Sequence, residues 1–235
     1  MRAWQRFFYW ETMKINRSMA KQESAGIGAM DEIAPDLQVM HAHLRVLFGD
    51  LPNEFQDGLI EISWTEKKDG KLKHSKLFPA DKLSTAAATA ARVNAVPGQS
   101  VYFGAALRKS TTPRWRRAAD SHFYAATGAY ADFDGPGDLE RAEVICRERN
   151  CEATFKVYTG RHPHERAQLW WRLASPISDP EMYRRLNRAL AEALGGDPTV
   201  INPGRVMRLA GSIAWPRKKG RIVERTELVI PEAGA

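Results

Sequence analysis

Two acidic residues two positions apart are the first candidates for chemistry. Residues 129–135 are Ala-Tyr-Ala-Asp-Phe-Asp-Gly, and this alternation predicts a strand that carries Asp132 and Asp134 on one face. Carboxylates this close repel each other unless a cation lies between them, and Mg²⁺ prefers oxygen ligands. Residues 135–137, Gly-Pro-Gly, should end the strand and leave the pair at its mouth. The pattern predicts a divalent-metal site, and the alternative is a solvated strand end with two acids.

A turn with hydroxyl, arginine and imidazole groups follows the apolar run 153–158. Its sequence is Thr159-Gly160-Arg161-His162-Pro163-His164. Thr159, Arg161 and His164 can each donate hydrogen bonds to triphosphate oxygens, and Gly160 permits a tight turn. This segment therefore predicts a nucleotide-phosphate site. The alternative is a surface turn whose polar side chains are unrelated.

A third acid and two more arginines come later in the chain. Asp197 follows the helix stop Gly195-Gly196, and Arg205 and Arg208 lie three residues apart in the run that follows. An extended or turned run there could direct both arginines at one anionic ligand. The alternatives are that Asp197 only shapes a turn before proline and that both arginines are solvated.

Two basic clusters are candidates for contacts with a nucleic-acid backbone. The chain has 35 Lys and Arg against 28 Asp and Glu, a formal charge of +7 and a pI near 9.5, which favours a polyanionic partner. We expect the phosphates of a nucleic-acid backbone to contact Arg114, Arg116, Arg117, Arg217, Lys218 and Lys219. The alternative is that both clusters are solvated loops.

The elements that must position these residues alternate between helical and strand patterns. The predicted elements are a helix ending at Phe48, strands 59–64 and 71–78, helix 81–93, strand 99–106, strand 123–134, helix 139–149, strands 153–158 and 168–173, helix 180–194 and strand 222–230. Asp179, Pro180 and Gly195 are typical of the two ends of the last helix.

Composition indicates a folded chain without a membrane segment. Hydrophobic residues make up 43% and charged residues 27%, as in ordinary globular proteins. We expect residues 1–30 to be a flexible extension and 31–235 to form the catalytic domain, with lobes of about 31–120 and 121–235. Two cysteines, no long apolar stretch and no secretion signal lead us to expect a cytoplasmic protein with no membrane partner.

In this order, the segments 131–134 (Ala-Asp-Phe-Asp), 159–164 (Thr-Gly-Arg-His-Pro-His) and 197–211 resemble the three motifs of the archaeo-eukaryotic primase superfamily. They are most similar to those of RepB-like primase-polymerases from plasmids and phages, and the resemblance spans about residues 95–215. It departs from the family pattern at Thr159 and at His162-Pro163, where family members often have Ser and a second Gly.

The resemblance implies an α+β fold, with an α/β N-terminal lobe packed on a catalytic lobe of RNA-recognition (RRM-like) antiparallel-sheet type. It implies a DNA primase and polymerase that adds dNTPs or NTPs on a single-stranded DNA template, using two Mg²⁺ or Mn²⁺ ions. The implied metal ligands are Asp132, Asp134 and Asp197, and the implied nucleotide ligands are Thr159, Gly160, Arg161, His164, Arg205 and Arg208. No Gly-x4-Gly-Lys-Ser/Thr motif is present, so we expect unwinding to need a separate helicase domain or subunit.

Two other functions fit parts of the pattern. A rolling-circle (HUH-type) nicking endonuclease would use His162 and His164 as metal ligands and Tyr183 as the attacking residue, but Pro163 breaks strand pairing and the two acids would have no role. A non-catalytic single-strand binding module would stack bases on Trp115, Trp170, Trp171 or Trp215, and it leaves the three acids unexplained.

Overall fold

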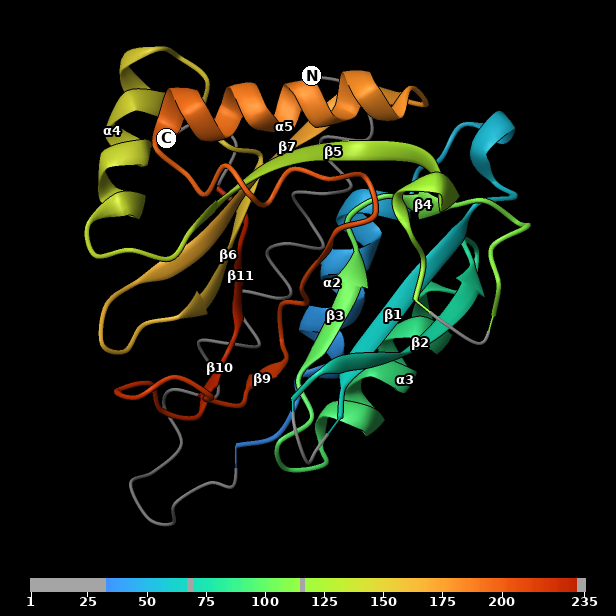
Figure 1. Cartoon of the computed structure of the whole chain (residues 1–235), viewed down its shortest axis with the longest axis horizontal. Coiled ribbons are helices and arrows are strands. Elements are labelled where there is room, and N and C mark those ends of the chain that lie inside the picture. Colours follow the sequence, from blue (N-terminus) through green and yellow to red (C-terminus); the bar gives the residue numbers. More distant parts are fainter. Residues whose placement is uncertain (1–32, 67–69, 115–116, 232–235) are drawn as a thin grey trace. The chain divides into compact units, whose positions relative to one another are not determined.

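The computed structural model describes residues 33–66, 70–114 and 117–231 (Figure 1). The predicted extension 1–30 and two predicted contact residues, Trp115 and Arg116, lie outside the described residues. Residues 33–229 form one compact unit. The predicted domain limits and the predicted boundary between two lobes near residue 120 stay predictions.

An antiparallel sheet runs through this unit. Among the described residues it has nine strands, in the order β11-β6-β7-β5-β4-β1-β3-β8, with β2 paired to β1, and β9 and β10 form a separate pair. The strands are β1 Leu59–Thr65, β2 Leu72–Pro79, β3 Val101–Gly104, β4 Leu107–Arg108, β5 Phe123–Phe133, β6 Phe155–Gly160, β7 Arg166–Ile177, β8 Val206–Arg208, β9 Ile213–Ala214, β10 Glu224–Arg225 and β11 Glu227–Val229.

Four α-helices and two short 3-10 turns accompany the sheet in the described residues. They are α2 Leu37–Phe48, η1 Asn53–Phe55, α3 Leu83–Asn94, η2 Asp120–His122, α4 Asp138–Glu148 and α5 Pro180–Leu194. The predicted ends of α5 are confirmed, because Asp179 accepts a hydrogen bond from the amide of Glu181 and Gly195 has a positive φ of 73°. Figure 1 shows α4 and α5 together beside β5, β6 and β7.

Each face of strands β5, β6 and β7 is buried by a different set of elements. On one face, Ala131, Phe133 and Leu169 form a core with residues of α4 and α5, among them Leu139 and Leu194. Burial of such apolar side chains stabilises the fold by roughly 25 cal/mol per Å². Because successive side chains of a strand point to opposite faces, this core determines which residues of β5 lie on the opposite face of the sheet.

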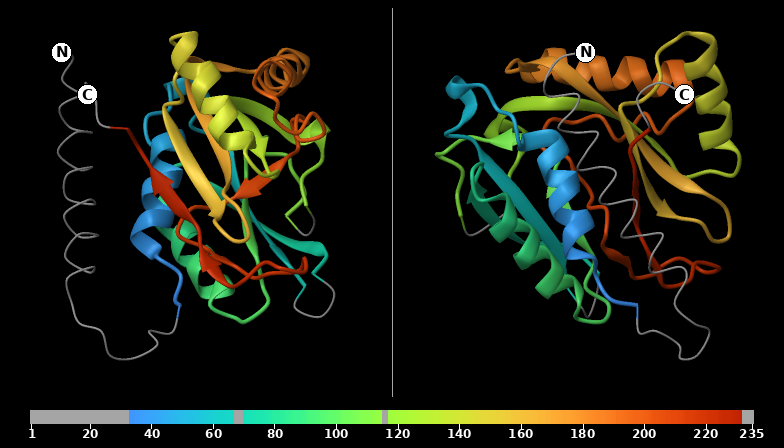
Figure 2. Two further views of the ribbon diagram at one scale, coloured as in Figure 1. Left: turned by 90° about the vertical axis from the view of Figure 1, so that its left-hand side faces the viewer. Right: turned by 180° about the vertical axis from the view of Figure 1, so that it is seen from behind.

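On the opposite face, aromatic side chains join the strands to α2 and β3. The ring of Trp170 stacks on Phe155 with centroids 5.7 Å apart and lies 5.8 Å from Phe103. His43 of α2 meets the ring of Phe103 edge-on at 4.8 Å. Figure 2 shows α2 and α3 on the side of the molecule away from α4 and α5. On this same face, the end of β5 and the paired start of β7 carry the candidate site, next to the aromatic core.

Most predicted elements are confirmed to within two or three residues. Three differences matter for the site. The predicted strand 99–106 is shortened to β3, with β4 just beyond its predicted end, and strand 222–230 is split into β10 and β11. The short strands β8 and β9 were not predicted. Finally, β5 ends at Phe133, so the prediction that Asp134 belongs to the strand is wrong.

Candidate active site

Asp132 lies near the end of β5, at the centre of the candidate site. It is opposite Gln168 of β7 in the strand register, while its neighbours Ala131 and Phe133 pack on the other face. The segment after α5 closes against this strand, because the amide of Asp197 donates to the carbonyl of Asp132 at 2.9 Å. Two predicted ligands that are far apart in the sequence are therefore neighbours in the structure.

The carboxyl group of Asp132 lies in a region of concentrated negative charge. Burial raises its pKa to about 7, and the negative charges of Asp134 and Asp197 contribute to the increase. The charge of Arg205 and the amide of Gln168 oppose it. A positive charge placed here would favour the ionised carboxylate, as expected for a cation site.

Asp134 lies just beyond the strand and is held by two cations. Its Oδ2 accepts a hydrogen bond from Nη2 of Arg221 at 2.9 Å and lies 3.4 Å from Nζ of Lys218. Burial alone would raise the pKa of Asp134, but Arg221 and Lys218 hold it below its usual value. Nε2 of His164 donates to the carbonyl of Asp134 at 2.8 Å, so the imidazole lies beside the acids.

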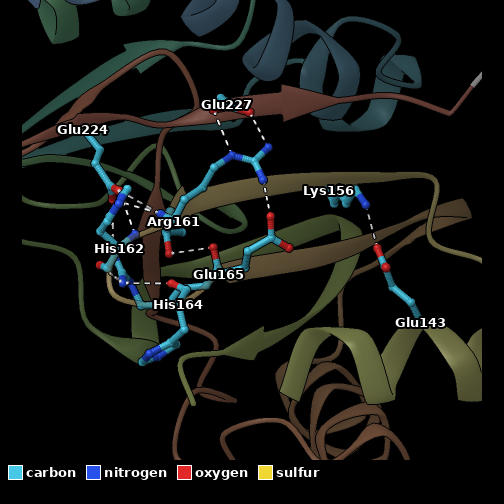
Figure 3. Close-up of polar contacts among 10 residues, drawn as sticks. Glu143, Lys156, Arg161, His162, His164, Glu165, Glu224 and Glu227 are labelled. Carbon is cyan, nitrogen blue, oxygen red and sulfur yellow. Dashed lines mark hydrogen bonds and ion pairs between the residues drawn. The ribbon is translucent and has the colours of Figure 1, made fainter. Parts of the chain in front are cut away.

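Arg161, a predicted phosphate ligand, joins two glutamates instead. Its Nε and Nη2 donate to Glu227 of β11 at 3.2 and 2.7 Å, Nη1 pairs with Glu165, and the guanidinium lies over the ring of Tyr158. Figure 3 shows this guanidinium pointing toward β11 and away from the ring of His164. The structure thus does not bring Arg161 together with the acids, and its predicted role would require these ion pairs to break.

Thr159 and Gly160 shape the turn that carries His164. The hydroxyl of Thr159 donates to the carbonyl of Arg166 at 3.3 Å. A Cβ on residue 160 would collide with the guanidinium of Arg166, so glycine is required by close approach. Glu224 accepts hydrogen bonds from the amides of Arg161 and His162 at 2.9 and 2.8 Å. Thr159 and Gly160, both predicted phosphate ligands, therefore form the end of β6 and support the turn that follows it.

Arg166 was not predicted as a site residue. Its side chain is only 3% exposed, and it donates to the carbonyls of His162 and His164 and to Glu224 at 3.2 Å. Burial, together with the positive charge of Arg221, lowers its pKa. Its alternation with apolar neighbours just before the predicted strand 168–173 could have marked Arg166 as a site residue. Its burial, however, depends on Glu224 in a distant strand.

The loop of residues 202–205, which carries Arg205, is clamped from two sides. On one side, the buried guanidinium of Arg108 donates to the carbonyls of residues 203–205 at 2.8–3.2 Å and pairs with Glu61 at 2.9 Å. On the other, Asp120 accepts from the amide of Gly204 at 2.7 Å and from the side chain of Asn202 at 3.1 Å. Arg108 was not predicted as a site residue, because its role depends on contacts with Glu61 and with a loop distant in the sequence.

Comparison with known proteins decides the fold. No protein-family model and no curated protein matches the sequence. Three solved structures do match. The AEP domain of the cyanophage S-2L primase-polymerase is 20% identical over 83% of this chain and 90% of that chain, with a TM-score of 0.53. Primase RepB′ is 18% identical over 82% of this chain and 55% of that chain, with a TM-score of 0.52.

The third is the catalytic domain of primase RepB′ in complex with initiator DNA, which is 19% identical over 80% of this chain and 82% of that chain, with a TM-score of 0.52. This chain has the archaeo-eukaryotic primase fold. The predicted α+β class with a mainly antiparallel sheet is confirmed.

Within the primase fold, the two predicted arginines have different surroundings. Arg205 lies close enough to Asp132 for its charge to lower the pKa of that acid, and its Nη2 lies 3.4 Å from the carbonyl of Thr199. Arg208 lies over the ring of Tyr102, with 4.5 Å between its Cζ and the ring centroid. Its Nη1 is buried and has no hydrogen-bond partner among the described residues, which is uncommon for a buried guanidinium.

In the primase fold, the basic side chains that were predicted to contact a nucleic-acid backbone differ in exposure and in their contacts within the protein. Arg114 and Lys219 are exposed, whereas Arg117 is partly buried. Arg217 donates to the carbonyl of Gly98 at 2.8 Å, and Lys218 faces Asp134. Their predicted contacts with nucleic acid stay predictions.

Burial contradicts the main residues of both rival functions. Tyr183, the attacking residue of a nicking endonuclease, is fully buried, and burial raises its pKa above the usual value. Trp170 is also fully buried, so it cannot stack on a base. Trp171 and Trp215 are partly buried and donate to the carbonyls of Cys151 and Asn94. Among the helices that the structure describes, none has the length and apolar composition to cross a bilayer.

The three acids are close together but do not yet converge on one point. Across residues 33–66, 70–114 and 117–231, no three acidic, histidine or cysteine side chains form a preformed metal-binding group. Two of the three acids are directed toward other partners. Asp134 is turned toward Lys218 and Arg221, and Oδ1 of Asp197 accepts from the amide and hydroxyl of Thr199 at 2.8 and 2.7 Å.

Proposed function

We propose that this chain is a DNA primase-polymerase catalytic domain. It would join nucleotides on a single-stranded DNA template and extend a primer, in the replication of a plasmid, phage or mobile element. The observation that carries the proposal is that Asp134 and Asp197 lie close enough to Asp132 to raise its pKa, with His164 bonded to the carbonyl of Asp134, in a chain with the primase fold.

Asp132, Asp134 and Asp197 would hold Mg²⁺ or Mn²⁺. The fit is supported by the donor set, which consists of carboxylate oxygens, and by the negative charges of Asp134 and Asp197, which add to the effect of burial in raising the pKa of Asp132. When bound, two such ions supply activation of the 3′ hydroxyl and stabilisation of the pyrophosphate leaving group. Asp134 would first have to give up its contacts with Lys218 and Arg221.

The other residues would bind and orient the nucleotide. Arg205 stands in a clamped loop near Asp132, so its guanidinium is positioned before a triphosphate arrives. His164 already donates from Nε2 to the carbonyl of Asp134, so its Nδ1 could donate to a phosphate only when the ring is protonated. Arg208 adds a buried nitrogen without a partner among the described residues.

Replacing the two acids of β5 and its end tests the proposal. The double variant D132A/D134A should lose incorporation of labelled nucleotide on a single-stranded template with Mn²⁺, both with and without a primer. D81A serves as the matched control, because Asp81 is an exposed acid that pairs with its neighbour Lys82. Circular dichroism should show both variants folded. Undiminished incorporation by D132A/D134A would contradict the assignment.

A further inference from the structure

A turn of four residues, 218–221, covers the carboxylate of Asp134. The amide of Arg221 donates to the carbonyl of Lys218 at 3.3 Å, and Gly220 has a φ of 83°, a backbone conformation that favours glycine. The turn brings both cations to the same oxygen: Oδ2 of Asp134 lies 2.9 Å from Arg221 and 3.4 Å from Lys218. One edge of the acid site is therefore closed by the chain's own cations.

The chain is anchored on both sides of this turn. Before it, Nη2 of Arg217 donates to the carbonyls of Gly98 and Glu66 at 2.8 and 3.4 Å. After it, Glu224 accepts from the amides of the 160–164 turn and pairs with Arg166. Residues 218–220 between these anchors are exposed. The turn can therefore leave Asp134 without disturbing the strands that flank it.

The two contacts that hold the turn on Asp134 differ in exposure. The side chain of Lys218 is 71% exposed and that of Asp134 43% exposed, so water and salt screen this ion pair and it contributes little. The side chain of Arg221 is 24% exposed, so its ion pair with Asp134 is the less screened of the two. A divalent cation would interact with Asp134 and also with Asp132 and Asp197, whose charges crowd the same place. The balance at Asp134 therefore favours exchange once such a cation is present.

We propose that Lys218 and Arg221 are exchangeable counter-ions of Asp134. They neutralise the carboxylate while no divalent cation is bound, and they bind phosphate oxygens once Asp134 has become a metal ligand. The proposal rests on the proposed function, because it takes Asp134 as a ligand. It adds that metal binding opens a phosphate-binding pair, so the chain's own cations restrain its metal affinity.

Titration of the full chain with Mn²⁺ alone tests the first half. Free Mn²⁺ is measured by electron paramagnetic resonance at about 0.1 M salt, where the Debye length is about 10 Å. R221Q should bind Mn²⁺ about two- to fivefold more tightly than the unchanged chain, because one competing ion pair is gone. R225Q is the matched control, since Arg225 is exposed on β10 and has no ion pair with Asp134; it should change the affinity less.

The outcomes separate the two proposals. Equal Mn²⁺ affinities in R221Q and R225Q, with binding retained, would overturn the exchange and leave the metal site standing. The absence of saturable Mn²⁺ binding in every variant and in the unchanged chain would remove the metal site itself. Trypsin gives a readout without equilibrium titration: cleavage after Lys218 or Arg221 should become faster when Mn²⁺ is added, and D134N should show the faster cleavage without metal.

Two binding assays test the phosphate half and identify the source of the phosphate. At saturating Mn²⁺, one measures a non-hydrolysable nucleoside triphosphate and the other a single-stranded oligonucleotide. R221Q should weaken one of them severalfold relative to R225Q, and the arm that weakens shows whether the pair binds the nucleotide or the nucleic-acid backbone. Unchanged affinities in both arms would overturn this half of the proposal.

Discussion

At the scale of single residues, the site is defined by how differently two neighbouring acids behave. Asp132 is partly buried near Asp197, and its pKa is raised to about 7. Asp134 is only two positions away, yet Arg221 and Lys218 hold its pKa below the usual value. Their environments, and not their spacing, set this difference, because the strand ends between them.

The raised pKa of Asp132 predicts that the free energy of unfolding depends on pH. The folded chain binds a proton at Asp132 up to about pH 7, whereas the unfolded chain releases it near pH 4, so the contribution of Asp132 to stability falls as the pH rises between these values. A pKa difference of about three units corresponds to a loss of at most about 4 kcal/mol in unfolding free energy. D132N should remove this loss. Urea unfolding in EDTA at pH 5 and pH 8 measures it.

The control for this experiment is D134N, because Asp134 already has two cationic partners. We expect D132N to be more stable than the unchanged chain at pH 8 and D134N not to be. Identical pH dependence in D132N and in the unchanged chain would show that the carboxyl group of Asp132 does not titrate differently on folding.

At the scale of elements, the sequence predicted the strands and helices of the site better than the contacts between them. Alternation and end signals located β5, β7 and α5, and the approach of Asp197 to Asp132 follows from where α5 ends. The ion pairs of Arg161 were not predictable in the same way. They depend on β11 pairing with β6, and the 226–229 segment gives no sign of that register.

The clamp around the 202–205 loop gives a prediction at this scale. D120N should weaken the hydrogen bond to the amide of Gly204 and the support of Asn202, so the loop would place Arg205 less well. We expect the KM for the nucleotide to rise about tenfold, with a smaller change in kcat and a loss of roughly 1 kcal/mol in unfolding free energy. Steady-state incorporation assays and urea unfolding measure the two effects.

R184Q is the control for the clamp, because Arg184 pairs with Asp120 at 2.9 Å and its hydrogen bonds in the described part of the chain go to Asp120 and Glu181. It should lower stability without a comparable rise in KM. If D120N and R184Q change KM equally, Asp120 acts on the fold as a whole and not on the position of Arg205.

At the scale of the whole molecule, one buried histidine connects elements from both halves of the chain. Nδ1 of His43 in α2 accepts a hydrogen bond from the amide of Ala210 at 3.0 Å. Its ring meets Phe103 of β3, Phe155 of β6 and Trp170 of β7 edge-on. Since Nδ1 is the acceptor, the ring is neutral and carries its proton on Nε2.

We therefore expect low pH to weaken these contacts of His43 together and to lower the free energy of unfolding. Burial lowers the pKa of His43 to about 3, so the folded chain keeps the ring neutral while the unfolded chain takes up a proton below about pH 6.5. Stability that is present above pH 6.5 is then lost as the pH falls, by about 2 kcal/mol at pH 5. H43Q should lose less stability than the unchanged chain between pH 7.5 and pH 5.0 in urea unfolding followed by tryptophan fluorescence, although its starting stability is lower. H41Q, two residues earlier on the same helix and hydrogen-bonded to Ser84, should keep the full pH dependence. An H43Q chain with an unchanged loss between the two pH values would assign the acid sensitivity to another group.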